Sequence, residues 1–301
     1  MSAHRLLLLG ANGQIGQALC AQPMPQDWQL GAYGHAELDI ADHRAVQDAI
    51  DTFRPGFIIN AAAFTAVDEA ELDLPRATGI NFEAVANLAA QSSARDIPLL
   101  HLSTDYVFDG NDGDAPYTPE HKMNPLNNYG HSKMMGEEAL RHGHPFHVIL
   151  RVSSVFGEFA SNLLTKTLAM IDGEDELRVV TDQISCPTYA PAIAETILAI
   201  AVAILKGKHD GFGTFHYCGT PEATRFDFVS EVMKQYAPFT ARRPRITPIK
   251  RADLAGVAAR PPYSVLDCGK IRDVYGIKQK PWRASLGEAI SILMGKRDKN
   301  T

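Results

Sequence analysis

Short, largely apolar runs alternate with longer amphipathic segments along the first half of the chain. The runs predict strands at 6–9, 28–33, 57–60, 98–102 and 146–152. The segments between them predict helices at 14–21, 42–54, 81–95 and from about 129 to 141. Strands with apolar residues on both faces are typical of a parallel sheet that helices cover on each side. The pattern therefore predicts an α/β fold, a doubly wound parallel sheet of the Rossmann type.

The second half continues with weaker signals. It predicts helices at 161–171, 191–205 and 226–236, strands at 177–182 and 214–217, and a more irregular, proline-broken stretch at 238–263. We expect residues 1–155 to form a dinucleotide-binding domain whose sheet is completed by parts of 156–235. Residues 156–301 should form mainly a smaller C-terminal substrate-binding lobe that closes over the carboxyl edge of the sheet.

The first predicted strand leads directly into Gly10-Ala11-Asn12-Gly13-Gln14-Ile15-Gly16. Glycines at this spacing permit a tight strand-to-helix turn and a close approach of the backbone to a ligand. The helix that follows offers free N–H groups and the positive end of its dipole to a pyrophosphate. A glycine triplet after a buried strand therefore predicts a dinucleotide site.

Cofactor choice depends on the segments after the second and third strands. Gly34-His35-Ala36-Glu37 lacks a carboxylate at the place that usually binds the adenosine ribose of NAD. Asp39 is the next candidate for the adenine side, although it could equally cap the helix that begins near Asp42. The small side chains of Ala61, Ala62 and Ala63 suit a backbone that lies against a flat cofactor, and close helix packing would favour them too. Because nothing obvious repels a 2′-phosphate, we expect NADPH, with NADH as a possible second cofactor.

A tyrosine and a lysine that could form an acid/base pair, Tyr129 and Lys133, follow the loop at 109–124. On a helix this spacing puts both side chains on one face, and a solvated helix face is the plainer alternative. A nearby ammonium lowers the pKa of a tyrosine from its usual value of about 10. Ser103 and Thr104 follow the fourth strand, at the sheet edge where such folds bind ligands.

The composition of the chain limits the classes of molecule that it is expected to bind. The chain has 301 residues, 45% of them hydrophobic, and a formal net charge of -6 without long Lys/Arg runs. This argues against a nucleic-acid or membrane-surface partner and favours a small molecule. The apolar run before Gly10 is too short for a signal peptide, so we expect a cytoplasmic protein.

Neither the cysteines nor the histidines predict a metal site. The four cysteines are far apart in the sequence and form no CxxC pair, so we interpret them as reduced, buried thiols. His142, His144 and His147 have a ligand-like spacing, but no carboxylate or cysteine accompanies them.

These motifs, in this order, resemble the extended short-chain dehydrogenase/reductase superfamily and, more narrowly, the dTDP-4-dehydrorhamnose reductase family. The narrower resemblance rests on five segments that extend over almost the whole chain: Asn60 to Asp68, Ser103 to Gly110, Asn124 to Gly130, Pro187-Thr188, and Arg260-Pro261 followed by Ser264, Leu266 and Lys270. It implies NAD(P)H-dependent reduction of the 4-keto group of a dTDP-4-dehydro-6-deoxyhexose, dTDP-4-dehydro-L-rhamnose to dTDP-L-rhamnose, for rhamnose-containing cell-surface polysaccharide.

The resemblance also assigns roles to residues. It implies that Tyr129 donates a proton, that Lys133 lowers the pKa of Tyr129 and holds the nicotinamide ribose, and that Thr104 orients the sugar carbonyl. The implied cofactor-binding residues are Gly10, Asn12, Gly13, Gln14, Ile15, Gly16, Asp39, Ile40, Ala61, Ala62, Ala63, Tyr129 and Lys133. The implied substrate-binding residues are Thr104, Asp105, Tyr106, Ser154 and Arg260.

The chain departs from the family pattern at two places. Ser154 stands where members often carry a tryptophan that contacts the sugar, which leaves the sugar open. Gln17-Ala18 and Ala190-Pro191 replace the neighbourhoods of glutamates that hold magnesium between subunits of some relatives. We therefore expect no metal, and a homodimer stays open.

Two other functions are compatible with the same motifs. A nucleotide-sugar dehydratase or epimerase of the superfamily would share the cofactor and the Tyr129–Lys133 pair, but dehydratases usually follow the threonine with Asp-Glu, and here Tyr106 follows Asp105. A non-catalytic, dinucleotide-binding regulatory subunit, such as the partner of methionine adenosyltransferase, would not need the catalytic residues that this chain retains.

Overall fold

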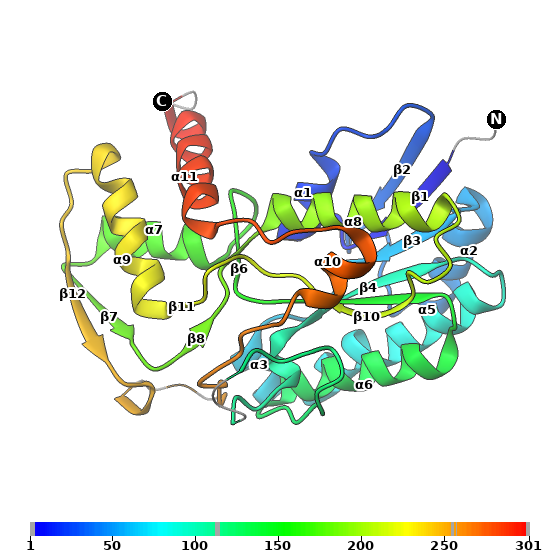
Figure 1. Ribbon diagram of the computed structural model, residues 1–301, viewed down its shortest axis with the longest axis horizontal. Helices are drawn as coiled ribbons and strands as arrows, with labels where there is room; N and C mark the ends of the chain where they lie inside the picture. Colours follow the sequence, from blue (N-terminus) through cyan, green and yellow to red (C-terminus); the bar gives the residue numbers. More distant parts are fainter. Residues whose placement is uncertain (1–3, 112–114, 254–255, 257, 299–301) are drawn as a thin grey trace.

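The computed structural model describes residues 4–111, 115–253, 256 and 258–298, so parts of the predicted segments 109–124 and 238–263 lie outside it. Its centre is a six-stranded sheet in the order β10-β5-β4-β3-β1-β2, in which all neighbouring strands are parallel (Figure 1). The strands are β1 (His4–Leu9), β2 (Trp28–Tyr33), β3 (Phe57–Asn60), β4 (Leu99–Thr104), β5 (His147–Val152) and β10 (Gly213–His216). The strand order reverses between β1 and β3, the position beyond which doubly wound sheets bind their ligands.

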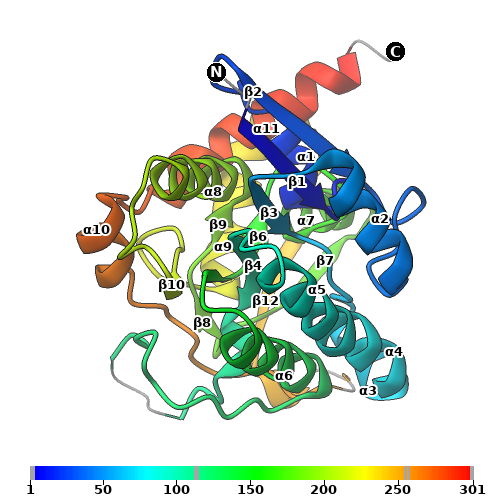
Figure 2. The same cartoon turned by 90° about the vertical axis from the view of Figure 1, so that its right-hand side faces the viewer.

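The strands inside the sheet, β1, β3, β4 and β5, are buried on both faces, whereas the edge strand β2 is partly exposed. Leu6 and Leu8 of β1 belong to one core cluster, whereas Leu7 and Leu9 belong to the other. The first cluster includes residues of α1 (Gln14–Cys20) and α8 (Ala190–Leu205), and the second includes residues of α2 (His43–Phe53), α5 (Ala84–Ser93) and α6 (Asn128–Gly143). Figure 2 shows α5 and α6 side by side on one face of the sheet. The predicted Rossmann-type fold is confirmed.

The helix predicted at 81–95 corresponds to α5 (Ala84–Ser93), and further helical structure comes before it. It is preceded by α3 (Val67–Leu72), α4 (Leu74–Thr78) and a π-helical turn at Gly79–Glu83 that runs directly into α5. π-Helical turns are rare and are frequent at functional sites. This one places Asn81 beneath the loop that follows β3.

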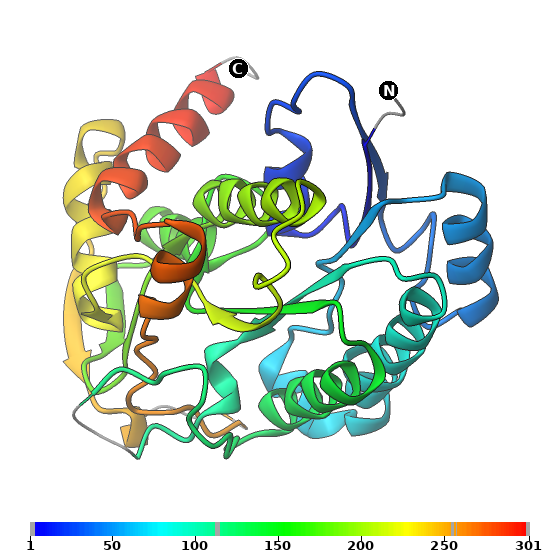
Figure 3. The same ribbon diagram turned by 45° about the vertical axis from the view of Figure 1, so that its right-hand side comes forward.

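Beyond β5 the chain forms three small sheets and the helices around them (Figure 3). β7 (Glu176–Val180) pairs with β12 (Arg245–Ile249), β8 (Ile184–Ser185) with β11 (Ala223–Thr224), and β6 (Val155–Phe156) with β9 (Thr188–Tyr189). The helices are α7 (Leu163–Gly173), α9 (Arg225–Tyr236), α10 (Gly269–Tyr275) and α11 (Trp282–Asp298).

Five strands of this region were not expected: the two-residue strands β6, β8, β9 and β11, and the longer β12. β12 lies within the stretch 238–263, where the sequence predicts irregular structure, and it contains Pro248. A proline has no backbone N–H and usually argues against a strand. β12 tolerates it because the strand pairs only with β7, which makes it an edge strand.

The cysteines differ in part from the expectation. Cys186, Cys218 and Cys268 are buried, but Cys20 is exposed, so the prediction that all four are buried is wrong. Cys218 and Cys268 come from distant parts of the sequence, and their Sγ atoms lie 3.6 Å apart.

The three histidines near β5 each bond to a backbone carbonyl. The rings of His142, His144 and His147 contact the carbonyl oxygens of Glu138, Ile97 and His144, respectively. In the part of the chain that the structure describes, no group of three His, Cys, Asp or Glu residues could hold a metal ion. Within the same ranges, no helix has the length and apolarity needed to cross a membrane.

Candidate active site

The turn after β1 holds the backbone of Gly10 against the loop after β3. Gly10 has a φ of +84°, and a Cβ there would lie 2.5 Å from the Ala62 nitrogen. A Cβ on Gly16 would lie 2.2 Å from the Gly10 oxygen. Larger residues would therefore separate the turn, the helix and β3. Gly13 precedes α1 and supplies no side-chain cap, which leaves the first N–H groups of the helix without a side-chain partner.

A cavity of about 270 Å³ lies beside this turn. Eight predicted cofactor-binding residues line it: Gly10, Asn12, Gly13, Asp39, Ile40, Ala61, Ala62 and Ala63. His35 and Arg76, which the sequence pattern did not indicate, also line it. The alternative for Asp39 is resolved, because Asp42 caps α2 and accepts the N–H groups of Arg44 and Ala45. Asp39 instead accepts the N–H of Ala41 at 3.0 Å and faces the cavity.

A second cavity, also of about 270 Å³, lies at the carboxyl ends of β4 and β5. It is lined by eight further predicted residues: Gln14, Ile15, Thr104, Asp105, Tyr106, Tyr129, Lys133 and Ser154. Ala61 and Ala63 line both cavities, so the two meet along the loop after β3. Gly16 and Arg260 line neither of them.

The paired cavities fit a nicotinamide dinucleotide. Their shared wall is made of small side chains, and the glycine turn, Gly10 to Gly16, lies between them. The Oε1 atom of Gln14 is buried without a hydrogen-bond partner and belongs to a residue of the second cavity. A hydroxyl or amide of a bound cofactor would satisfy this atom, since buried polar groups are normally paired.

α6 presents the tyrosine and the lysine from its first two turns. Asn127 caps this helix, and its Oδ1 accepts the N–H of Gly130 at 2.8 Å. A Cβ on Gly130 would lie 2.2 Å from the Tyr106 oxygen, so the helix rests directly on the turn after β4. The ring of Tyr106 packs edge-on against that of Tyr129, with centroids 6.0 Å apart. The i,i+4 spacing thus places Tyr129 and Lys133 in the same cavity, as predicted.

The pKa shifts of Tyr129 and Lys133 differ from the expectation. Burial raises the pKa of Tyr129, although a hydrogen bond with Thr104 acts in the opposite direction. Burial lowers the pKa of Lys133 to about 7, and the nearby charge of Glu137 opposes this. In this structure, therefore, Lys133 does not bring the pKa of Tyr129 below its ordinary value, and that expected effect is wrong here. The phenol stays protonated at neutral pH, which is the form that a proton donor needs.

A buried amide that the sequence analysis did not single out supports this arrangement. Asn81 accepts the N–H of Phe64 at 2.9 Å and donates to the Phe64 oxygen at 3.0 Å. Its Nδ2 also donates to the Ser132 hydroxyl at 2.9 Å. Asn81 therefore ties the loop after β3 to α6. Only its position in a π-helical turn marks it, and that turn is not visible in the sequence pattern.

On the substrate side, Asp105 is held by three hydroxyl groups. Ser153 and Ser264 donate to its Oδ2 at 2.8 and 2.6 Å, and Thr104 donates to its Oδ1 at 3.2 Å. Burial raises the pKa of Asp105, and these hydrogen bonds oppose the shift. Because Ser264 comes from the C-terminal part of the chain, Asp105 connects that part to the end of β4.

Two arginines lie near the second cavity. Arg225, at the start of α9, lines this cavity and a neighbouring one of about 50 Å³, and no sequence motif indicated it. Arg260 forms an ion pair with Asp68 of α3 at 2.6 Å. The predicted contact of Arg260 with substrate thus stays a prediction.

A sheet that can hold a dinucleotide, with a tyrosine and a lysine at its carboxyl edge, defines a short-chain dehydrogenase/reductase, an NAD(P)-dependent oxidoreductase. Residues 4–294 match the family model described as the RmlD substrate binding domain. The chain belongs to the dTDP-4-dehydrorhamnose reductase family.

Known relatives are similar over almost their full length. The chain is 37% identical to a dTDP-4-dehydrorhamnose reductase of Sinorhizobium fredii over 291 residues, 96% of this chain and 98% of the relative. It is 33% identical over 292 residues, 96% of each chain, to a probable dTDP-4,6-dihydroxy-2-methyloxan-3-one 4-ketoreductase of Streptomyces antibioticus. A crystal structure of dTDP-4-dehydrorhamnose reductase from Bacillus anthracis in complex with NADP superimposes with a TM-score of 0.86, at 30% identity, covering 96% of this chain and 99% of that chain.

Proposed function

We propose that the protein catalyses the NADPH-dependent reduction of dTDP-4-dehydro-L-rhamnose to dTDP-L-rhamnose, for rhamnose-containing cell-surface polysaccharide. One observation carries the proposal: Thr104, Tyr129 and Lys133 line a single cavity, which Gln14 and Ile15 of the glycine turn also line. A carbonyl bound there would lie between the cofactor site and the proton donor. In this proposal, residues 1–155, with β10 completing the sheet, hold the cofactor, and residues 156–301 hold mainly the sugar nucleotide.

Each residue then has a defined part in the reaction. When bound, NADPH would supply a hydride for the C4 carbonyl, whose oxygen needs a proton as negative charge develops on it. Tyr129 donates that proton. The Thr104 hydroxyl accepts the N–H of Tyr106 at 3.1 Å, and its one proton bonds to Asp105 in this structure. To hold the carbonyl oxygen of a bound substrate, that O–H turns from Asp105 to the carbonyl. Lys133, when charged, stabilises the phenolate that remains.

The proposal is tested by following the absorbance of NADPH in the presence of purified protein and 4-keto sugar nucleotides. Oxidation that depends on dTDP-4-dehydro-L-rhamnose and is slower with dTDP-4-dehydro-6-deoxy-D-glucose is the expected result. If only another 4-keto sugar were reduced, the proposed substrate would be wrong, but the proposed reaction type, reduction of a 4-keto group, would still hold. Binding of NADPH without turnover of any 4-keto sugar would favour the regulatory subunit instead.

The cavity of the glycine turn leads to a prediction on cofactor choice. His35 and Arg76 line it together with Asp39, so a 2′-phosphate would meet a guanidinium there. We expect NADPH and NADH to bind with affinities that differ by less than about a hundredfold, roughly 2.7 kcal/mol. Arg76→Ala should weaken NADPH about tenfold, the loss of one charge-assisted contact, and leave NADH unchanged.

Fluorescence titration with both cofactors would check this prediction. Arg95→Ala is the matched control, because Arg95 is paired with Asp51 and lines neither cavity. Equal weakening of NADPH and NADH by Arg76→Ala would place the 2′-phosphate elsewhere.

Two further parts of the proposal rest on the family resemblance and on the chemistry. We place the reaction in the cytoplasm, where reduced nicotinamide cofactors are available. A homodimer is the proposed assembly, and analytical ultracentrifugation of the purified chain would test it.

A further inference from the structure

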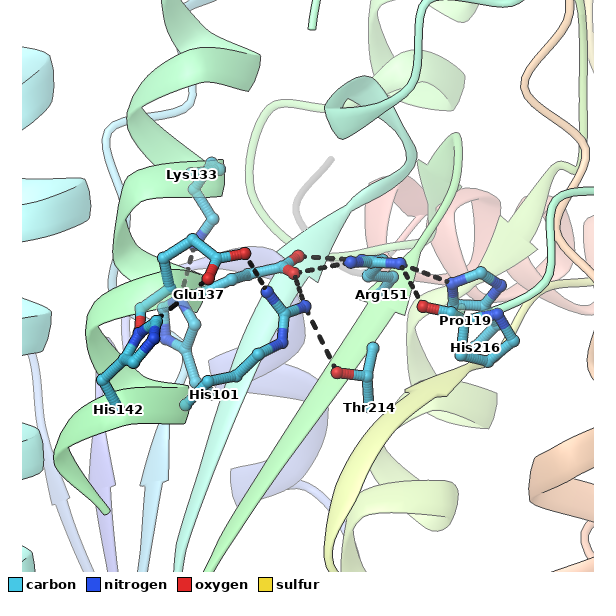
Figure 4. Close-up of polar contacts among 10 residues, drawn as sticks. His101, Pro119, Lys133, Glu137, His142, Arg151, Thr214 and His216 are labelled. Carbon is cyan, nitrogen blue, oxygen red and sulfur yellow. Dashed lines mark hydrogen bonds and ion pairs between the residues drawn. The ribbon is translucent and has the colours of Figure 1, made fainter. Parts of the chain in front are cut away.

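The amine of Lys133 contacts two polar groups of β4. Its Nζ donates to the Leu102 oxygen at 2.7 Å and lies 3.0 Å from Nε2 of His101 (Figure 4). Lys133 is 1% exposed and His101 is 0% exposed, so water does not replace either contact. Neighbouring protein groups therefore determine whether Nε2 of His101 or Nζ of Lys133 carries the proton between them.

Asn60 decides which nitrogen of His101 carries a proton. The N–H of Ala62 donates to Oδ1 of Asn60 at 3.1 Å, which turns Nδ2 of Asn60 toward Nδ1 of His101, also at 3.1 Å. An amide NH₂ group can only donate, so Nδ1 of His101 must accept. The neutral ring then carries its proton on Nε2, which points at Lys133.

This arrangement fits an uncharged lysine. A neutral amine can accept the Nε2 proton and still donate to Leu102, whereas an ammonium has no lone pair. Charging Lys133 requires the proton of His101 to move to Nδ1, where it would face the NH₂ group of Asn60. Turning the amide of Asn60 would relieve that contact but would remove the acceptor of the Ala62 N–H. Protonation of Lys133 is therefore opposed by the hydrogen bond from the Ala62 N–H to Oδ1 of Asn60.

We propose that His101 is a positioning residue whose tautomer, set by Asn60, determines whether Lys133 is held as a neutral amine or as a cation. Through Lys133, His101 then governs how readily Tyr129 gives up its proton. The inference deepens the proposed function and rests on it only for this last step. His101 lines neither large cavity and contacts Lys133, which lines the second one.

Other charged groups near Lys133 act in known directions. Tyr129 and Glu137 lie on α6 itself, one turn before and one turn after the lysine. The carboxylate of Glu137 is shared with Arg151 of β5 and with Arg141. Asp105, at the end of β4, acts on Tyr129. Burial, with the charge of Lys133 as a second cause, lowers the pKa of His101 well below its usual value, so the ring stays neutral while its tautomer changes.

Nuclear magnetic resonance of the purified full-length protein can follow both partners without substrate. Lys133 would be observed through [13Cε]lysine labelling and assigned by its loss in Lys133→Met. Its titration midpoint should lie near 7. The ring nitrogens of His101, seen in 15N-histidine spectra, should change from Nε2–H to Nδ1–H as the pH falls through the same midpoint.

An internal reference is available in His144. Its Nε2 lies 2.8 Å from the Ile97 carbonyl, which can only accept, so it should remain Nε2–H throughout. Lys133→Met should abolish the change at His101. Nδ1–H on His101 at high pH, or a tautomer that ignores the Lys133 midpoint, would overturn the proposal.

Two substitutions of Asn60 test the cause. Asn60→Asp presents oxygens that only accept, and Asn60→Ser presents a neutral hydroxyl that can accept, so either should stabilise Nδ1–H on His101. Each should raise the Lys133 midpoint by about one pH unit, the worth of one hydrogen bond. In the pH profile of keto-sugar reduction, the alkaline limb, where the rate falls as the pH rises, should move by the same amount.

His144→Gln, at a buried histidine remote from Lys133, should leave both the midpoint and the alkaline limb in place. An unmoved Lys133 midpoint in both folded Asn60 variants would refute the inference. Absence of keto-sugar turnover in the parent would refute the proposed function alone, because the resonance measurements need no substrate.

Discussion

Replacing Tyr129 by phenylalanine should lower the rate of keto-sugar reduction by about 10² to 10⁴, the usual cost of removing a positioned general acid. NADPH should still bind, because the ring and the helix remain. The substitution removes only the hydroxyl that forms a hydrogen bond with Thr104 in the second cavity. Steady-state kinetics and a fluorescence titration of NADPH on the same preparation would separate the two effects.

Tyr275→Phe provides a control for this substitution. The hydroxyl of Tyr275 bonds to the Gly211 carbonyl, and Tyr275 lines neither large cavity of the site. This variant should keep the parental rate. If Tyr129→Phe reduced the keto sugar as fast as the parent, the first turns of α6 would not be the catalytic centre.

Replacing Arg151 by methionine should lower the free energy of unfolding by about 3–5 kcal/mol, the range for a buried ion pair that loses one partner. The Nε and Nη2 atoms of Arg151 donate to the two oxygens of Glu137 at 2.9 and 2.7 Å (Figure 4). Its Nη1 donates to the Pro119 oxygen at 3.3 Å and lies 3.2 Å from Nε2 of His216. Arg151 and Glu137 are 1% and 0% exposed, so the substitution leaves a carboxylate that water cannot solvate.

Urea titration would measure this loss. The double variant Glu137→Leu/Arg151→Met removes both charges and should be less destabilised than Arg151→Met alone. Arg95→Met, which breaks the exposed pair with Asp51, should cost less than about 1 kcal/mol. A cost for Arg151→Met as small as that of Arg95→Met would show that Arg141 alone balances Glu137.

The same pair predicts the effect of acid. Burial acts to raise the pKa of Glu137, but Arg151 and Arg141 outweigh it and lower the pKa. A lowered pKa in the folded protein means that the contribution is fully present above the unfolded value of about 4.3. It should be lost as the pH falls through the folded pKa, and this loss should be absent from the double variant.

The sequence by itself determined the features that follow local rules. The inner strands of the main sheet were predicted because a strand buried on both faces must be a continuous apolar run, and β3 matches the predicted bounds 57–60. The glycine turn was predicted because backbone that approaches this closely excludes a Cβ, as Gly10 and Gly16 show. Tyr129 and Lys133 were placed together because the helix repeat alone brings residues four apart onto one face.

Only the tertiary structure decided which groups share a proton or a charge. The sequence pattern does not bring Asn60 to His101, or Ser264 to Asp105, because these contacts join residues 41 and 159 positions apart. Local spacing likewise could not tell whether Arg260 faces substrate or pairs with Asp68, at a distance of 192 positions. Burial, which lowers the pKa of Lys133 to about 7, is a property of all the elements packed around one atom. The residues of the acid/base pair are therefore encoded locally, whereas their protonation is set by the fold.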